Sequence, residues 1–304
     1  MGCISGLTFA FDRDRYWSVD ADARRLIPIR GVGGVLLDVF ERKGVPFVLC
    51  APTKRTLEIR SGWKMTLVKQ FSNLHQLDTM GGVLDSAKER LITIGIESRH
   101  EGAQEEIIGS GSICVWDFNG NRKFPSHSFD GIPVSIARDG RAQIVAVALY
   151  NGDILLLNVG ESRLEEVGRF EFVEVSLNPI KVRLSSDGRF VGASSVNACK
   201  FWRTDSSSQP PILVVSISDY LWDNSHLCFL GEQRAICGIK KRLFSISLEP
   251  SPEVEFEIDL GIYIEGLSIS PQTGCVVVVG YKEYGDKHMI YKFDISSKEL
   301  TVIE

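Results

Sequence analysis

The sequence predicts an all-β protein built from one repeated unit of four antiparallel strands. The segment Gly111-Ser-Ile-Cys-Val-Trp-Asp-Phe-Asn-Gly120, a strand that ends in a tight turn, recurs in weaker form along the chain. Its copies recur at intervals of roughly 40–60 residues, near the roughly 40–50 residues of one propeller blade. Helix-favouring runs are almost absent, and turn dipeptides separate the apolar runs. Together these observations predict a β-propeller of seven blades, each of four antiparallel strands, with six blades as the alternative. The aligned apolar positions are Leu57, Trp116, Leu156, Trp202, Phe244 and Tyr291.

The first half of the chain matches the repeat loosely. Residues 1–31 predict three strands of a blade (LTFAFDRDR, YWSVDADA and RRLIPIR), and without them the ring would have six blades. We expect seven, because an incomplete ring would leave sheet edges exposed. Residues 32–74 predict a second blade. Residues 75–129 predict a third, interrupted by a polar, Gly-rich insertion at 96–112 that we expect to be a mobile loop, either an interaction loop or inert.

The second half repeats more regularly. Residues 130–172 contain four short apolar or alternating runs, with Asp139-Gly140 and Asn151-Gly152 between them. Such dipeptides supply the positive φ angles that tight hairpins need. Asp187-Gly188 occupies the same first turn in the next unit. A single domain over residues 1–304 is therefore expected, with its blades at 1–31, 32–74, 75–129, 130–172, 173–217, 218–259 and 260–304.

Composition agrees with one compact body. The 304 residues are 44% hydrophobic and 24% charged, which is ordinary for a globular protein. No apolar run approaches the length of a membrane span or resembles a secretory signal. The seven cysteines never form a CxxC pair and read as buried reduced thiols of a reducing compartment. A net charge of −5 argues against a nucleic-acid partner.

The string ICVWDFNG resembles the third strand of a WD-repeat blade. In that family the Trp packs between sheets and the Asp ends the strand, roles that the resemblance gives to Trp116 and Asp117, with Trp202 as a second blade signature. Trp202 is followed by Arg203, and no blade shows the Gly-His pair of typical repeats. We therefore expect the Asp-His-Ser-Trp hydrogen-bond network of such repeats to be missing from most blades.

A narrower resemblance rests on the order of the blades. The chain resembles, in the order of its segments, the N-terminal propeller of a core subunit of the vacuolar-sorting tethering complexes HOPS and CORVET. The segments are RLITIG (90–95), a polar insertion, SICVWDFNG, VAVALYNGDILLLNVGESRLEEV and GCVVVVGYKEYGDKHMIYKFDIS. Those subunits continue into a long α-solenoid. The resemblance implies a role in vesicle trafficking and protein transport.

Signs of catalysis are scarce. The five histidines show neither HxxxH nor HExxH spacing, and Gly31-Val-Gly-Gly34 lacks the Lys of a phosphate-binding loop. There is no GxSxG elbow. We therefore expect a protein that is not an enzyme and that needs no cofactor or metal. A lactonase-like propeller enzyme, which gathers its ligands from separate blades, is the second alternative.

The N-terminus leaves two interpretations open. Met1-Gly2-Cys3 resembles the start of a myristoylated and palmitoylated protein, although Gly6 stands where the motif has Ser or Thr. Alternatively, Cys3 and Ile4 lead into the first strand.

Function in propellers concentrates on the loops of the ring's faces. Loops that join second to third strands share one face, and their positive charge is expected on an arc over blades six, seven, one and two. Negative charge is expected beside it, on the insertion of blade three. Such a divided face would orient a partner, although solvated hairpin tips would look the same. The candidate partner-binding residues are Arg24, Arg25, Lys54, Arg55, Lys240, Lys241, Arg242 and Tyr284.

The sequence therefore predicts a cytoplasmic, non-enzymatic scaffold that docks other protein subunits or peptides on one face, peripheral to endosomal or vacuolar membranes if it belongs to a tethering complex. The alternative is a reader of phosphoinositides or other anionic lipids that uses the same basic arc.

Overall fold

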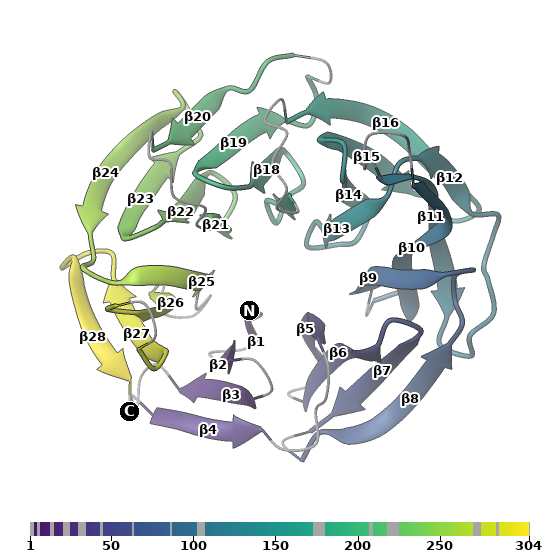
Figure 1. Ribbon diagram of the computed structural model, residues 1–304, viewed down its shortest axis with the longest axis horizontal. Helices are drawn as coiled ribbons and strands as arrows, with labels where there is room; N and C mark the ends of the chain where they lie inside the picture. The colour runs from purple at the N-terminus through teal and green to yellow at the C-terminus, as the bar shows by residue number, and fades with distance from the viewer. Residues whose placement is uncertain are drawn as a thin grey trace.

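Seven four-stranded sheets lie around a common axis and form a closed ring (Figure 1). Each sheet is one blade, numbered here in chain order. The computed structural model describes residues 3–4, 7–12, 15–20, 25–29, 35–42, 45–62, 64–85, 87–101, 107–172, 180–206, 209–217, 225–269, 275–283 and 286–303. The all-β, seven-bladed propeller predicted from the sequence is confirmed.

Blades 1 to 4 carry the first sixteen strands. Blade 1 contains β1 (Cys3–Ile4), β2 (Leu7–Asp12), β3 (Arg15–Asp20) and β4 (Arg25–Ile29). Blade 2 contains β5 (Val35–Arg42), β6 (Val45–Thr53), β7 (Thr56–Ser61) and β8 (Thr66–Ser72). Blade 3 contains β9 (Asp78–Asp85), β10 (Arg90–Glu101), β11 (Ile107–Asp117) and β12 (His127–Asp130). Blade 4 contains β13 (Pro133–Arg138), β14 (Ile144–Leu149), β15 (Asp153–Val159) and β16 (Leu164–Glu171).

Blades 5 to 7 complete the ring. Blade 5 contains β17 (Lys181–Leu184), β18 (Phe190–Ser194), β19 (Ala198–Arg203) and β20 (Leu213–Ser216). Blade 6 contains β21 (Ser225–Leu230), β22 (Arg234–Ile239), β23 (Arg242–Ser247) and β24 (Glu253–Asp259). Blade 7 contains β25 (Tyr263–Ile269), β26 (Val276–Tyr281), β27 (Met289–Asp294) and β28 (Glu299–Ile303).

Each sheet is built from four consecutive strands paired antiparallel. The first strand lies nearest the axis and the fourth lies at the rim (Figure 1). Blades 1 and 7 lie side by side and share no strand. The ring therefore closes between blades 7 and 1 without a shared strand.

The hydrophobic core consists of layers between adjacent blades. Leu57 and Phe71 of blade 2 pack in one cluster with Trp116 of blade 3. In the layer between blades 4 and 5, the Trp202 ring centroid lies 5.7 Å from that of Phe170 and 6.4 Å from that of Phe172. Both tryptophans thus fill the space between sheets, where aromatic side chains bury large apolar areas.

The glycines of the turn dipeptides are required for two different reasons, a positive φ angle or a close contact with a neighbouring backbone. Gly152 and Gly188 adopt positive φ angles of 99° and 73°, as the sequence predicts. In the turn at Asp139-Gly140, the positive φ falls instead on Ala142, at 50°. Gly140 is needed there for another reason, because a Cβ at this position would lie 2.8 Å from the backbone oxygen of Ser186 in the next blade.

The described cysteines include no disulfide, and the thiols are largely buried. Burial raises the pKa of Cys50 to about 11, so this thiol stays protonated and unreactive at neutral pH. No helix within the described ranges has the length and hydropathy to cross a bilayer.

Candidate interaction face

One face of the ring carries the loops that join second to third strands, together with the connectors between blades. We call it the connector face. The Thr79 backbone N–H donates to the Lys54 carbonyl oxygen at 2.7 Å, which ties the turn of blade 2 to the start of blade 3. The Ile264 N–H donates to the Lys240 carbonyl oxygen, also at 2.7 Å, and ties blade 6 to blade 7 in the same way. These bonds hold the hairpin tips against the connectors, so the face presents a fixed platform.

Lys54 and Arg55 lie on this face as predicted. The Lys54 side chain is 76% exposed, and its Nζ lies 3.7 Å from the Asp78 carboxylate. Arg55 is also exposed, and its carbonyl oxygen accepts a hydrogen bond from Asn73. An exposed ion pair contributes little to stability. Breaking this ion pair to bind a partner would therefore cost little free energy, and both side chains are accessible to a partner.

The three neighbouring cations of blade 6 do not form one exposed patch. Lys240 is only 8% exposed and sits in the left-handed region, with a φ of 56°. Lys241 places its Nζ 4.4 Å from the centroid of the Tyr263 ring. Arg242 is exposed and pairs with Glu257 at 2.7 Å. Lys240 is therefore a buried member of the predicted basic arc, because the connector to blade 7 is bonded across this turn.

Arg25 also differs from its predicted position. It is the first residue of β4 and pairs with Asp20 at the end of β3, so it belongs to the hairpin between the third and fourth strands. Successive hairpins of a meander alternate between the two faces of the ring. Arg25 therefore lies on the side opposite Lys54. Arg24 and Tyr284 lie outside the described residues.

Acidic side chains interrupt the predicted basic arc. Exposed Lys282 and Lys287 of blade 7 flank Glu283 and Asp286, which close a turn through a 3.0 Å hydrogen bond. On blade 3, Glu97 is engaged inside the molecule. Among the described residues of blade 7 the charge is thus mixed. The Glu101 side chain, Glu105 and Glu106, which belong to the predicted acidic sector, lie outside the described part of the chain.

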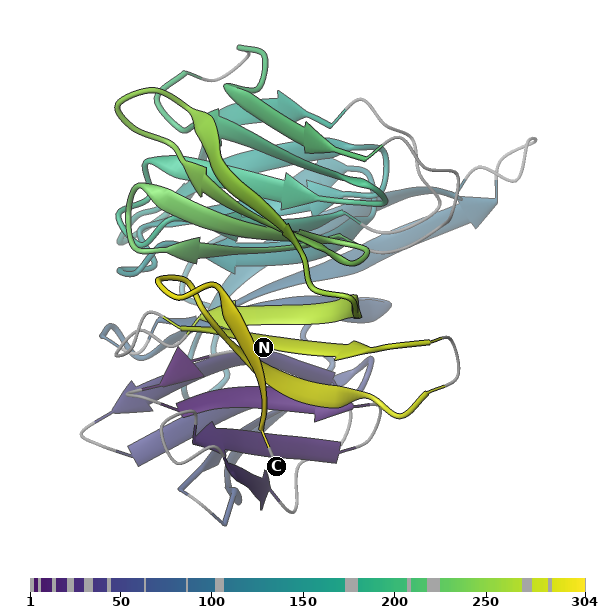
Figure 2. The same cartoon turned by 90° about the vertical axis from the view of Figure 1, so that its left-hand side faces the viewer.

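Within its described residues, 96–101 and 107–112, the insertion of blade 3 forms a β-ribbon. The β10–β11 pairing continues to Glu101 and Ile107, beyond the last β9 partner of β10, the pair Ile96–Asp78. β12 pairs with β11 only as far as Ser110. In Figure 2 this blue hairpin extends past the rest of the ring. The part beyond the sheet is therefore two-stranded, and strands β9 and β12 flank only its base.

A buried chain of hydrogen bonds anchors the base of this ribbon. The Trp116 indole Nε1–H donates to the Thr93 hydroxyl oxygen at 2.8 Å. That hydroxyl lies 2.8 Å from His75 Nε2, and His75 Nδ1 lies 2.9 Å from a Glu97 carboxylate oxygen. With Nδ1–H donating to the carboxylate, Nε2 accepts from Thr93, and every group has its partner. Ser112 also donates to Glu97.

This chain resembles the Asp-His-Ser-Trp network of WD repeats, with Glu97 and Thr93 as the variant members. Burial lowers the pKa of His75. Burial alone would raise the pKa of Glu97, but hydrogen bonds from Ser112, His75 and Gln76 outweigh it and hold that pKa below its usual value. Sequence reasoning missed His75 because no glycine precedes it. A His before the first strand and a Thr on the second were the available signals.

Asp117 ends β11 and closes the following turn. One carboxylate oxygen accepts the backbone N–H groups of Asn119 and Asn121, at 2.9 and 2.8 Å. These bonds hold the pKa of Asp117 below its usual value. Its position and contacts are those of a strand-ending turn residue.

The sheet plan, the inter-sheet tryptophans and the network of blade 3 define a WD40-type β-propeller as the fold class of this chain. The structure is similar to the WD40 domain of coronin from Toxoplasma gondii, with a TM-score of 0.65 and 9% sequence identity over 99% of this chain and 80% of that one. It is also similar to a chain of a mitotic checkpoint complex, with a TM-score of 0.62 and 12% identity over 91% of this chain and 82% of that one. No protein-family model and no curated protein sequence matches the chain. At these identities the likeness concerns the fold.

Proposed function

We propose that this protein is a non-enzymatic scaffold that binds other proteins on its connector face, and that the β10–β11 ribbon is the principal contact. The ribbon carries the proposal. Beyond Ile96 on one side and Ser110 on the other, its edges extend past β9 and β12. An extended peptide can add to such an edge as a further strand, with backbone hydrogen bonds supplying affinity.

Lys54 and Arg55 extend the same face on blade 2. Their charges would steer an acidic partner and raise its association rate more than its affinity. Protein partners also fit the solved structures of this fold, one of which is a chain of a mitotic checkpoint complex.

The backbone geometry of the ribbon suggests a sharp test. The Gly109 carbonyl oxygen accepts from Gly131, so the polar groups of Gly109 point away from β10. Arg99 lies directly opposite Gly109. In an antiparallel ladder, the N–H and C=O groups of two opposite residues either both point toward the other strand or both point away from it. The N–H of Arg99 therefore points outward at the edge. Arg99→Pro removes this donor without removing a bond between β10 and β11, whereas Arg99→Ala keeps it.

We expect Arg99→Pro to weaken partner binding at least tenfold, and Arg99→Ala to bind within about twofold of wild type, since one hydrogen bond to a partner contributes roughly 0.5–1.5 kcal/mol and a proline also clashes with an added strand. Partners isolated with the wild-type protein and titrated against both variants give the measurement. Equal binding by the two variants at an unchanged unfolding midpoint would refute strand addition at this edge.

The finer proposal concerns the cellular role. Similarity in blade order to the propeller of HOPS and CORVET core subunits supports a module of an endolysosomal tethering complex, cytoplasmic and peripheral to endosomal or vacuolar membranes. Copurification with other subunits of such a complex, lost in Arg99→Pro, would support it. If liposomes containing anionic lipid capture the purified protein and no subunit copurifies, the protein is a lipid reader instead.

A further inference from the structure

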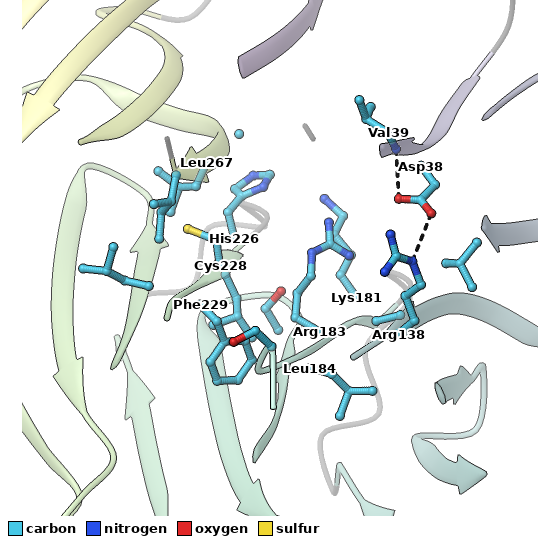
Figure 3. A pocket seen from close by; sticks show the side chains of 18 of the residues that line it. Asp38, Val39, Arg138, Lys181, Arg183, Leu184, His226, Cys228, Phe229 and Leu267 are labelled. Carbon is cyan, nitrogen blue, oxygen red and sulfur yellow. Dashed lines mark hydrogen bonds and ion pairs between the residues drawn. The ribbon is translucent and has the colours of Figure 1, made fainter. Parts of the chain in front are cut away.

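The centre of the ring holds a cavity of about 1030 Å³, lined by residues of the inner strands and their turns. Small-molecule sites typically have volumes of roughly 300–1000 Å³. Figure 3 shows Lys181, Arg183 and His226 extending toward the same part of this cavity. Lys181 and Arg183 belong to β17, and His226 belongs to the neighbouring inner strand β21.

The two β17 cations line the cavity because of strand periodicity. Lys181 and Arg183 alternate with Val182 and Leu184, which are buried in the layer between blades 4 and 5. Side chains two residues apart on a strand share a face. Burial lowers the pKa of Lys181, and the positive charge of Arg183 lowers it further. The fold therefore holds two like charges together in a partly desolvated place.

Most other charged groups of the cavity are already engaged. The Asp38 carboxylate accepts the backbone N–H of Leu84 at 2.8 Å and lies 3.3 Å from the Arg138 Nε. The Asp139 carboxylate accepts from the backbone of its own turn. Glu265 acts on Lys181 through space. Among the described residues, no carboxylate lies within ion-pair distance of Lys181 or Arg183, and the Arg183 guanidinium donates to the carbonyl oxygen of Val182 at 3.0 Å.

His226 supplies a second, independent observation. It is 8% exposed, and its Nε2 atom has no hydrogen-bond partner within the described part of the chain. Burial lowers the pKa of His226 well below its usual range, and the charge of Lys181 lowers it further, so the ring is neutral at pH 7. A buried polar atom without a partner normally costs roughly 1–3 kcal/mol. A ligand acceptor at Nε2–H would remove that cost.

We propose that the central cavity binds a phosphorylated small molecule, with its phosphate group held by Lys181, Arg183 and the Nε2–H of His226. Arg and Lys are the usual side chains for phosphate, since the guanidinium can donate two parallel hydrogen bonds and the ammonium provides a compact charge. Phosphate oxygens accept from all three groups, and the anion neutralises the two cations. Arg138 is held by Asp38 and stays outside the site.

The test uses the whole chain and three soluble probes at constant ionic strength: sodium pyrophosphate, inositol hexakisphosphate and, as the non-phosphate control, sodium glutamate. We expect saturable binding of both phosphates by calorimetry, with a raised unfolding midpoint, and none of glutamate. Arg183→Gln and Lys181→Gln should each weaken binding at least tenfold. The matched control is Arg163→Gln, which removes a guanidinium that is 74% exposed and pairs with Glu165, and it should bind like wild type.

The unfolding temperature of the ligand-free variants is a second readout. If Lys181 and Arg183 had a purely structural role, their substitution would lower it. Because each substitution removes one of two like charges that have no carboxylate partner in the described part of the chain, we expect Arg183→Gln and Lys181→Gln to unfold at the same temperature as wild type or higher. If Arg183→Gln does not fold, Lys181→Gln decides. Failure of the wild-type protein to bind either phosphate at millimolar concentration, or equal weakening in Arg163→Gln, would overturn the proposal.

Vesicles distinguish a lipid headgroup from a free phosphate. Binding to phosphoinositide vesicles that Arg183→Gln abolishes assigns the phosphate to a lipid. Binding of the soluble probes alone assigns it to a free metabolite. Vesicle binding that persists in Arg183→Gln, with no binding of the soluble probes, would refute the central site.

Discussion

The hydroxyl of Thr93 is the single atom on which the buried network of blade 3 depends. Its residue is 0% exposed, and the oxygen lies 2.8 Å from both Trp116 Nε1 and His75 Nε2. Thr93→Val keeps the shape and removes the oxygen, leaving one buried donor and one buried acceptor without partners. At roughly 1–3 kcal/mol for each group, the expected loss is about 2–6 kcal/mol. At about 2 °C per kcal/mol, the unfolding midpoint should fall by roughly 4–12 °C.

Thr93→Ser is the matched control, because it keeps the hydroxyl and loses one methyl group, worth about 0.8 kcal/mol. Urea denaturation of wild type and both variants gives the comparison. A double-mutant cycle with Trp116→Phe, which removes only one donor of the network, should show a coupling of roughly 0.5–3 kcal/mol. If the Val variant is no less stable than the Ser variant, or if the two substitutions add without coupling, the network does not act as described.

Three further outcomes are expected. Acidification should destabilise the protein, because the folded-state pKa of His75 lies below its unfolded value: its contribution is present above about pH 6.5 and is lost as the pH falls toward the folded value, with a slope of at most about 1.4 kcal/mol per pH unit. Glu97, whose folded pKa is also lowered, adds its loss below about pH 4.5. His75→Gln should reduce the slope of the upper part of the midpoint-against-pH profile and leave the share of His226, whose pKa burial also lowers. Gly95→Ala should cost as much as Thr93→Val, because its Cβ would lie 2.1 Å from the His75 Cγ, and full additivity of the two variants in denaturation would contradict this. Lys240→Glu should destabilise more than Arg242→Glu, because it reverses the sign of a buried charge, whereas Arg242→Glu should cost under about 1 kcal/mol, so equal unfolding midpoints would disprove the assigned burial.

Local sequence signals were sufficient for the architecture. Strand runs, turn dipeptides and the repeat of the Trp116 position are all properties of short segments, and short segments determine each meander. In the first blade, these local signals miss one strand. The sequence predicts three strands in residues 1–31, and the structure has a further strand, β1, before them. The hairpin at Arg25 therefore joins the third and fourth strands, and an offset of one strand moves it to the other face.

The candidate sites depended on contacts that the sequence does not show. Lys240 is buried because the connector to blade 7 covers its turn, and no pattern within blade 6 reveals that neighbour. The central cations show the same difficulty. Lys181 and Arg183 alternate with apolar residues, as ordinary half-exposed strand residues do, and only the closed ring brings His226 of another blade beside them.

The local strand pairing of every sheet has a consequence for how damage spreads through the molecule. Since all backbone ladders join neighbours in sequence, each meander can form by short-range hairpin closure. Side-chain layers and isolated hydrogen bonds, such as those from Thr79 to Lys54 and from Ile264 to Lys240, couple one meander to the next. The free energy of unfolding is then the sum of the intrinsic stability of each blade and the interaction energy between neighbouring blades, as in linear repeat arrays. Hydrogen exchange should therefore register a lesion at Thr93 in blades 2, 3 and 4, and leave protection in blade 6 close to its wild-type level.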